Sequence, residues 1–499
     1  MYAWPHWLAL VVMTPLAGAA LTPIAALLDR RSPPWWALAT MTFTSLAATM
    51  LVLRVFAEGP FSYLPGGWAA PYGVELRFDE FSAVVGVICL IGWMAILFSS
   101  RYTRSLPEFA SDRSPYYYAL LLLNLGGMIG FAVTGDLFNL FVFLEILSLS
   151  GYALVAVGGE RIAEMAAFKY LLMGAVSSVL VLFAIGFLYG MTGTLNIADV
   201  TARLGALEGP TAPAAVALAL LAVGFVTKAA IFPLHVWLPD AHAAAPSPVS
   251  AVLSGLVVKL GVIGMIRTYR IYYGAGLFDL TVLNHVLMWL GAISIVMGAF
   301  FAIFQEDVKL MLAYSTISNI GYIIMGLGLA TTYGVIGASV HIFNHALIKA
   351  TLFLAVGAII YRTGYRTLSD LRGVGRAMPL TSVALSIGAI SIVGIPPTAG
   401  FLCKWYITLG AFEANQPLFG FVLVFGALLI FVYYIRMVNA FYFREPIHAE
   451  VTEAREVPVS MLLPTLVLAS LCLIMGVLGR IPLTFIEPGV VRLLAPLGG

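Results

Sequence analysis

The stretch EMAAFKYLLMGAVSSVLVLFAIGFLYG, residues 164–190, decides the fold class, because its only charged residues, Glu164 and Lys169, lie near its start. A transmembrane α-helix needs about 20 consecutive, mostly apolar residues. Such runs recur along the whole chain, whereas a β-barrel would show alternating segments of about ten residues. We therefore expect an all-α, polytopic membrane protein of about fourteen transmembrane helices. The expected segments are 7–28, 35–57, 79–100, 116–134, 137–157, 164–190, 212–236, 247–273, 281–304, 307–329, 333–361, 378–409, 418–443 and 459–479.

The composition supports the same class. Of the 499 residues, 61% are hydrophobic and 10% are charged, and the mean hydropathy is +0.99. Soluble domains carry about 25% charged residues, so a soluble enzyme, a nucleic-acid binder and a disordered scaffold are excluded. The cysteines are too few and scattered for a disulfide framework or a metal cluster, and no glycine-rich dinucleotide fingerprint follows a strand-like segment. We expect no cofactor and no redox site in the chain itself.

The basic residues orient the predicted bundle. Loops and helix ends on one side hold 13 Lys and Arg residues, and those on the other side hold 7. Because basic residues favour the cytoplasmic side, we expect both termini on the outer face of a bacterial inner membrane. The first apolar run lacks a basic segment before it and is long enough to span, so we expect residues 7–28 to be a helix and not a cleaved signal.

An internal repeat relates two parts of the chain at an offset of 171 residues, which superimposes Asp136 on Asp307 and Gly193 on Gly364. The copies cover expected helices 4–8 and 9–13, and five spans in each copy turn the second one upside down in the membrane. Inverted repeats are typical of secondary transporters with a working site near the midplane; chance matching of small residues is the alternative. We expect one transmembrane domain, 1–499, made of helices 1–3 (1–110), a first repeat (116–273), a second repeat (281–443), and helix 14 with a tail (459–499).

The lysines are distributed differently from the arginines. Nineteen of the twenty arginines lie in predicted loops or at helix ends, with Arg436 as the exception, and Lys309 lies at a boundary. A charge at the bilayer centre costs about 3 kcal/mol or more, so intramembrane charges are candidates for function. Lysine suits proton transfer because it can release a proton when buried, whereas a guanidinium stays charged. The charged residues inside apolar runs are Lys169, Lys228, Lys259, Lys349, Lys404 and the acidic Glu145.

Several of these residues also have a purely structural interpretation. Lys169 lies near the end of its run, so its side chain can extend to the membrane surface. Lys228 and Glu145 can form a structural ion pair, although a buried pair seldom adds net stability over apolar replacements. Lys259 lies about twelve residues into its run, too deep to reach the surface easily, so it is either structurally paired or functional.

Three titratable residues, His341, His345 and Lys349, are spaced four residues apart and therefore line one face of a helix. A single histidine would be interpreted as a core residue with satisfied hydrogen bonds. Three such groups on one intramembrane face predict a proton wire. Metal binding by the two histidines is the rival interpretation, but a cationic lysine one turn further disfavours a divalent cation, and we expect no metal.

Expected helices 7 and 12 contain prolines in mid-span. Pro233 follows Lys228 by five residues, and Pro396 and Pro397 precede Lys404. Proline removes a backbone donor and interrupts a helix, and unwound backbone at membrane depth is tolerated where it lines a polar cavity. We expect both helices to be broken, with gating of hydration beside a lysine as the functional interpretation and packing kinks as the alternative.

At these residues the chain resembles the antiporter-like membrane subunits shared by respiratory complex I, Mrp-type cation/proton antiporters and membrane-bound hydrogenases. The resemblance implies fourteen helices, inverted five-helix repeats, broken helices 7 and 12, and a polar axis along the membrane midplane. It extends over expected helices 4 to 12, most of the chain. The stretches that carry it are 136–145 (DLFNLFVFLE), 232–242 (FPLHVWLPDAH), 245–248 (APSP) with Lys259, 341–349 (HIFNHALIK), and 394–397 (GIPP) with Lys404.

The resemblance also implies roles for single residues. Glu145 and Lys228 look like the acid–lysine pair of this superfamily, Lys259 like its bridging lysine, and Lys404 like the terminal residue near the exit. The central relay would consist of His341, His345 and Lys349. Secondary candidates in or beside the matching stretches are Lys169, His235, Asp240 and His242.

Two features bear on the subfamily. The chain length and the stretch 189–196 (YGMTGTLN), with Lys169 and Tyr170 before it, look like the D subunit of Mrp-type antiporters, whereas 237–242 (WLPDAH) is similar to complex I and hydrogenase relatives. About 20 residues follow helix 14, too few for the long lateral helix of the most distal complex I subunit. Lys404 also argues against the complex I member that carries glutamate there. The resemblance therefore implies a subunit of an Mrp-type antiporter, with a complex I-type NADH:quinone oxidoreductase or a membrane-bound hydrogenase as the alternative.

The implied partners are other membrane subunits and H⁺, with Na⁺ or K⁺ left open as the exchanged cation. Our hypothesis is proton translocation by charge displacement, in which Glu145 releases Lys228 and the proton passes by Lys259 to the central relay and then to Lys404. A second hypothesis is a coupling arm in a redox complex that adds little conduction of its own. A solute uniporter is a third, disfavoured because no large polar pocket is evident in the sequence.

Overall fold

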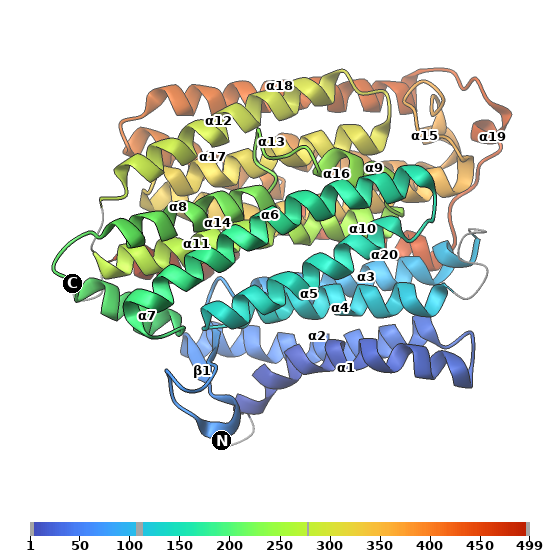
Figure 1. The fold of residues 1–499 in the computed structure, drawn as a ribbon. Coiled ribbons are helices and arrows are strands. Elements are labelled where there is room, and N and C mark those ends of the chain that lie inside the picture. Colours follow the sequence, from blue (N-terminus) through green and yellow to red (C-terminus); the bar gives the residue numbers. More distant parts are fainter. Residues whose placement is uncertain (1–3, 106–112, 277–278, 496–499) are drawn as a thin grey trace.

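The computed structural model describes residues 4–105, 113–276 and 279–495, which form one elongated bundle of helices (Figure 1). The sheet in this part of the chain is a two-stranded antiparallel hairpin of β1 (Phe61–Tyr63) and β2 (Leu76–Phe78). The helical elements up to the middle of the chain are α1 (Trp4–Leu28), α2 (Pro33–Glu58), the 3-10 turn η1 (Pro65–Gly67), α3 (Val84–Ser105), α4 (Ser114–Val133), α5 (Leu137–Ala156), α6 (Arg161–Thr192), α7 (Ile197–Gly205), α8 (Ala212–Lys228), α9 (Leu238–Ala244), α10 (Ser247–Val252), the π-turn η3 (Leu253–Val257) and α11 (Val258–Ala275). Those that follow are α12 (Thr281–Ile303), α13 (Val308–Gly328), α14 (Thr332–Thr363), α15 (Val374–Ala377), α16 (Pro379–Val393), α17 (Ala399–Glu413), α18 (Pro417–Phe443), α19 (Ala449–Thr452), α20 (Val459–Val477) and α21 (Arg480–Leu494).

The predicted all-α, polytopic fold is confirmed. Within the described residues, 12 helices are long and apolar enough to cross a membrane, and α8 and α16 are shorter apolar helices. The two predicted breaks are present, because α8 is followed by α9, and α16 by α17, after an interruption in the chain. Fourteen crossings result if each broken helix spans the membrane, and this count stays a prediction.

The offset of 171 residues recurs in the geometry of the helix ends. α6 and α14 each have 32 residues and end at Gly193 and Gly364, which have φ of 66° and 76°. Glycine is favoured at this left-handed position because it has no Cβ to clash. The sequence match at these glycines therefore corresponds to a shared helix stop.

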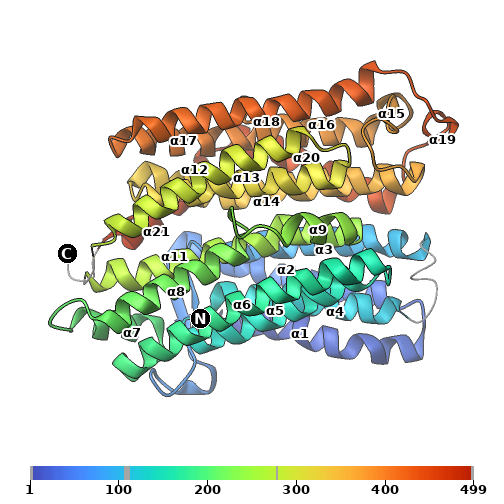
Figure 2. The same cartoon turned by 45° about the horizontal axis from the view of Figure 1, so that its top comes forward.

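The same offset relates a pair of backbone bridges. Asp136 caps α5 and forms an isolated β-bridge with Asn196, while Asp307 caps α13 and forms the equivalent bridge with Thr367. In Figure 1, α7, which begins next to Asn196, lies at one end of the bundle, and α15, just after Thr367, lies at the opposite end. Figure 2 shows the same opposition from a second direction. The two copies thus have the same local structure in inverted orientations.

The centre of the bundle is formed by α14 and by the segment α10–η3–α11. The most apolar window of the segment Ser247–Ala275 is completely buried, and that of α14 is 94% buried. In contrast, α6 and α18 direct large apolar side chains outward, among them Phe183 and Phe421. Helices with an exposed apolar face suit contact with lipid or with other membrane proteins. Because α11 and α14 are the most buried of these segments, their polar side chains lie deep inside the protein.

Three features of the structure were not expected from the sequence. The β1–β2 hairpin occupies an expected loop, and the expected tail forms a further helix, α21, which contacts α11 and α14. The placement of Arg267 at a loop or helix end was wrong, because this residue lies inside α11 with 4% of its surface exposed. Its partner lies far away in sequence, in the segment between β2 and α3, and is described below.

Candidate functional site

The predicted relay residues lie on elements that contact one another across the bundle. α8 contacts α11, η3 contacts α14, and α14 contacts α17. Glu145 on α5 is half-buried. The other predicted relay residues are buried, namely Lys228, Lys259, His341, His345, Lys349 and Lys404. Buried titratable groups therefore lie in both repeats, on elements that contact one another.

Both helix interruptions lie beside a lysine. Pro233 lies between α8 and α9, after Ala230, where φ is 55°. Pro396 and Pro397 lie between α16 and α17, after Gly394, where φ is 91°. Each interruption leaves backbone carbonyls at the end of the first half-helix without intrahelical partners.

Lys228 is the last residue of α8. Its Nζ donates hydrogen bonds to Ser148 Oγ at 2.7 Å and to Tyr152 OH at 3.3 Å. Glu145 precedes Ser148 by three residues on the same helix, so both lie on one face of α5. Glu145 Oε1 is buried without a hydrogen-bond partner among the described residues, which also show no ion pair between Glu145 and Lys228. Hydroxyl groups, and not a direct ion pair, hold the ammonium group.

Lys259 follows the π-turn η3. Its Nζ donates to the carbonyl oxygen of Ser254, and Ser254 Oγ lies 2.7 Å from Thr316 Oγ1. A π-turn changes the hydrogen-bond register of a helix and is frequent at functional sites. The turn thus supplies a backbone acceptor for a lysine that has 1% of its surface exposed.

The three residues on one face of α14 are all completely buried. The rings of His341 and His345 stack with centroids 5.4 Å apart. His341 Nδ1 lies 3.3 Å from Cys403 Sγ, and Lys349 Nζ donates to the carbonyl oxygen of Leu312 at 2.8 Å. Both ring nitrogens of His345 lack a hydrogen-bond partner among the described residues. The two histidine rings therefore stack along α14, whereas Lys349 binds a carbonyl of α13.

Lys404 on α17 reaches back to the end of the preceding half-helix. Its Nζ donates to the carbonyl oxygens of Ile392 at 2.7 Å and Val393 at 3.3 Å, and it lies 4.4 Å from the ring centroid of Tyr322. The C-terminus of a helix carries partial negative charge, which favours a cation. Lys228 is itself the last residue of α8, but its ammonium group points to hydroxyl groups of α5 and not to the carbonyls at the end of its own helix.

The secondary candidates are more varied. Lys169 and Asp240 form an ion pair of 2.6 Å, and each side chain is close to half exposed. His235 stacks on Phe232 with ring centroids 4.9 Å apart, whereas His242 is completely buried and neither of its ring nitrogens has a partner in the described part of the chain. The Lys169 geometry is that of a side chain extended toward a surface.

Sequence reasoning missed several residues of this region. Lys309, expected at a boundary, is buried and its Nζ donates to the carbonyl oxygen of Ala245. Ser148 and Tyr152 follow Glu145 at i+3 and i+7, and that helical spacing was a signal that could have identified them. No comparable signal marked Lys309, because its burial depends on the loop between α9 and α10.

A second buried charge cluster lies outside the relay. Arg267 Nη1 donates to Asp79 Oδ2 at 2.7 Å, and its Nη2 donates to Ser82 Oγ at 3.1 Å and Ala132 O at 3.0 Å. Arg270 also contacts Asp79, at 3.3 Å. Burial alone would raise the pKa of Asp79, but the two guanidinium groups and a backbone hydrogen bond from Ser82 lower it well below its usual range. This cluster attaches α11 to the segment before α3.

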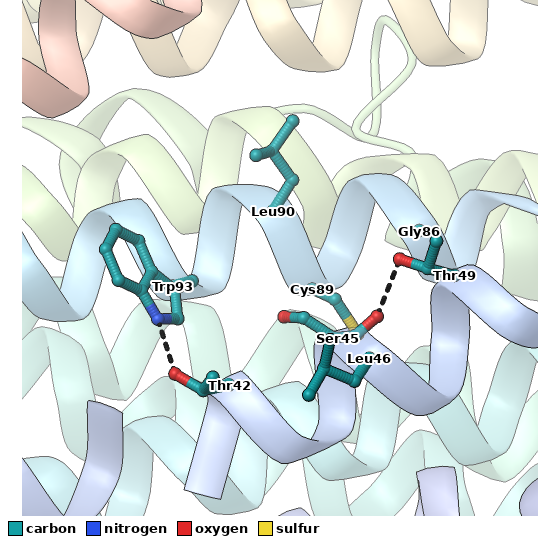
Figure 3. A pocket seen from close by; sticks show the side chains of 8 residues that line it. All are labelled: Thr42, Ser45, Leu46, Thr49, Gly86, Cys89, Leu90 and Trp93. Carbon is teal, nitrogen blue, oxygen red and sulfur yellow. Dashed lines mark hydrogen bonds between the residues drawn. The ribbon is translucent and has the colours of Figure 1, made fainter. Parts of the chain in front are cut away.

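A surface groove between α2 and α3 lies apart from both the relay and the arginine cluster. This groove has a volume of about 330 Å³, and no charged side chain forms its lining. Figure 3 shows the lining residues, among them Trp93, whose Nε1 donates to Thr42 Oγ1. The distance between these two atoms is 2.9 Å. Within residues 4–105, 113–276 and 279–495, no group of three or more His, Cys, Asp or Glu side chains is placed to hold a metal ion.

Comparison with protein families defines the class of the chain. A family model described as "NADH:quinone oxidoreductase/Mrp antiporter, TM" matches residues 134–430, which include every predicted relay residue. The chain therefore belongs to this family of antiporter-like membrane subunits.

Individual relatives include subunits of NADH-quinone oxidoreductases and subunits of Na⁺/H⁺ antiporters. The N subunit of the NADH-quinone oxidoreductase of Desulforudis audaxviator is 36% identical over 493 residues, covering 94% of this chain and 95% of that protein. The D subunit of the Na⁺/H⁺ antiporter of Alkalihalophilus pseudofirmus is 32% identical over 433 residues, covering 86% of each chain.

Two solved structures of respiratory or antiporter complexes contain a chain with a similar fold. A chain of an archaeal membrane-bound sulfane sulfur reductase superimposes with a TM-score of 0.89 at 30% identity and 98% coverage of both chains. A chain of the Mrp complex of a Dietzia species superimposes with a TM-score of 0.88 at 25% identity, covering 99% of this chain and 98% of the other. The fold is thus shared with a chain of an archaeal respiratory membrane complex and with a chain of an Mrp complex.

Proposed function

We propose that the chain is the proton-translocating subunit of a multi-subunit Mrp-type monovalent cation/proton antiporter. Its relay consists of Glu145, Lys228, Lys259, His341, His345, Lys349 and Lys404. The observation that carries this proposal is the hydrogen bonding of the four lysines in this relay, all of which are buried. Each donates to hydroxyl or carbonyl oxygens, and in the described part of the chain none of the four has an ion-pair partner.

Uncharged hydrogen-bond partners allow these buried lysines to release and take up a proton. A structural lysine inside a membrane protein is expected to pair with a carboxylate, because an uncompensated charge at this depth is costly. Hydroxyl and carbonyl oxygens accept a hydrogen bond from an amine as well as from an ammonium group, so the site tolerates both protonation states. The structural alternative for Lys259, ion pairing, therefore receives no support from its contacts.

The proton path would be completed by water. His341 Nε2 and both ring nitrogens of His345 are buried without a partner among the described residues. Buried polar atoms of this kind are where bridging water is expected. We propose that a proton from Lys228 passes by Lys259 to these rings and to Lys349.

The helix breaks would control access. Pro233, Pro396 and Pro397 interrupt the helices beside Lys228 and Lys404. The carbonyls at these breaks accept hydrogen bonds from groups outside a regular helix, such as Lys404 Nζ and Trp237 Nε1. Movement of the half-helices would alter how well these carbonyls are hydrated. Glu145, one turn from the Ser148 hydroxyl that holds Lys228, is positioned to influence its charge state. We propose that a neighbouring subunit acts on Glu145 and so starts the transfer.

The assembly and location are part of the same proposal. We propose a bacterial inner membrane as the location, both termini on the outer side, other membrane subunits as partners, and Na⁺ or K⁺ as the exchanged cation. The secondary residues Lys169, His235, Asp240 and His242 would lie beside the relay without carrying the proton. The repeats 116–273 and 281–443 would form two inverted halves joined at the relay, flanked by 1–110 and 459–499.

Transport by alanine variants tests the proposal. Glu145→Ala and Lys228→Ala are introduced into the assembled complex, and cation-driven proton movement is followed with a pH-sensitive dye in inverted membrane vesicles. We expect both variants to assemble normally and to lose transport, while the exposed Arg161→Ala on α6 keeps it. Full transport in both variants would remove these residues from the relay.

A subunit of a complex I-type oxidoreductase is the second candidate, and the similarity to the N subunit of such an enzyme over nearly the whole chain favours it. The relay would be unchanged, but the driving force would come from a redox module. Co-purification in a mild detergent distinguishes the two: small hydrophobic antiporter subunits support the first candidate, and proteins carrying flavin or iron–sulfur centres support the second.

A further inference from the structure

A cavity lined by arginines lies at one end of α18, away from the relay. It has a volume of about 290 Å³, and its lining includes Arg372, Arg436, Arg444, Asn439 and Glu306. Its cationic groups come from three parts of the chain, namely the loop after α14, α18 and the residue that follows α18. The fold therefore gathers these charges at a single place.

The cavity carries excess positive charge. Arg436 pairs with Glu306, which also accepts a hydrogen bond from Ser369 Oγ at 3.2 Å. Arg372 and Arg444 are exposed and have no hydrogen-bond or ion-pair partner among the described residues. One acidic group thus stands against three guanidinium groups, and two of these are free to bind an anion. Guanidinium forks match the geometry of phosphate oxygens.

The position of the cavity favours a membrane lipid as the source of a bound phosphate group. α18 is an outer helix of the bundle (Figure 1), and Phe431, Val432 and Ile435, in its C-terminal half, are 43–47% exposed. Arg444 follows the last residue of this helix. A ligand with its phosphate in the cavity could therefore lay apolar chains on α18. The basic loops also lie on the side that we propose to be cytoplasmic, where anionic lipids attract basic groups.

We propose that this cavity binds the phosphate headgroup of an anionic phospholipid whose acyl chains lie along α18. Arg372 and Arg444 bind the phosphate oxygens, and Asn439 donates from its side-chain amide. Arg436, held by Glu306, forms the cationic wall beneath them. This site is independent of the proposed transport mechanism.

Lipid titrations of the purified full-length protein in a neutral detergent test the site. The midpoint of thermal unfolding is measured against added phosphatidylglycerol, phosphatidylcholine or inorganic phosphate. We expect saturable stabilisation by phosphatidylglycerol alone. The double variant Arg372→Gln/Arg444→Gln should weaken the apparent affinity about 10- to 30-fold, because each basic contact near an anionic lipid surface contributes a factor of about three to five.

A matched control separates this site from general surface charge. Arg161→Gln/Arg455→Gln removes two exposed arginines from the same predicted side outside the cavity, and it should bind phosphatidylglycerol like the unmodified protein. Equal weakening in both double variants would overturn the proposal. Stabilisation by inorganic phosphate at the same concentration would replace a lipid site with a free-anion site. Loss of the lipid effect in the assembled complex would assign the cavity to a protein partner.

Discussion

Breaking the buried pair between Arg267 and Asp79 is expected to cost about 3–5 kcal/mol of folding free energy, the range for removing one member of a buried ion pair. The side chains are only 4% and 2% exposed. Arg267→Met removes three hydrogen bonds, those to Asp79, Ser82 and Ala132. Arg270, 3.3 Å from Asp79, retains part of the compensation, so we expect the lower end of this range, about 3 kcal/mol.

The free energy is measured by unfolding the detergent-solubilised protein with increasing mole fractions of sodium dodecyl sulfate. The double variant Asp79→Leu/Arg267→Met completes a thermodynamic cycle. It should be less destabilised than Arg267→Met alone, because no charge is then left buried without its partner.

The acid dependence gives a second test of the same pair. The folded-state pKa of Asp79 is lowered, so its stabilising contribution is present at neutral pH and is lost as the pH falls below the unfolded-state value toward the folded-state pKa. Asp79→Asn should lack this part of the acid dependence. A loss below about 1 kcal/mol in Arg267→Met, the size of a surface pair, would refute the reasoning.

Two further predictions concern helix contacts. A Cβ added at Gly261 would lie 2.5 Å from Ala229 N and would push α11 from α8; Gly261→Ala should therefore cost about 1–3 kcal/mol in the same titration and reduce transport. Gly186→Ala, with nothing within 4 Å of the added carbon, should leave both unchanged or slightly raise stability, and a similar loss in both variants would contradict the contact argument. The exposed pair of Lys169 and Asp240 should contribute about 0–1 kcal/mol, so Asp240→Asn should keep stability and transport; strong loss of transport would place this pair in the relay.

Most of the architecture could be predicted from the sequence because membrane helices are defined by local composition. The apolar runs agree with the helices within a few residues, and the match of Asp136 with Asp307 corresponds to the paired bridges at the two helix starts. The prolines predicted both breaks because an interrupted backbone is a local property of the chain.

The contacts of the site could not be predicted in the same way. The π-turn before Lys259, the hydroxyl groups that hold Lys228 and the burial of Arg267 depend on how distant helices pack. Arg267 lies near the end of its apolar run, so position alone suggested an exposed end. Its partner Asp79 is 188 residues earlier in the sequence, and local composition does not predict a contact between residues so far apart.

The most direct test of the relay is proton flux through the complex that contains Lys259→Arg. Arginine keeps the positive charge but does not release its proton, so a structural role for Lys259 would tolerate the change, whereas a relay would not. In proteoliposomes containing the assembled complex, we predict loss of cation-coupled proton flux in Lys259→Arg and equally in Lys259→Met, with normal assembly of both. Flux near the unmodified level in assembled Lys259→Arg would contradict the claim that this lysine transfers protons between the repeats.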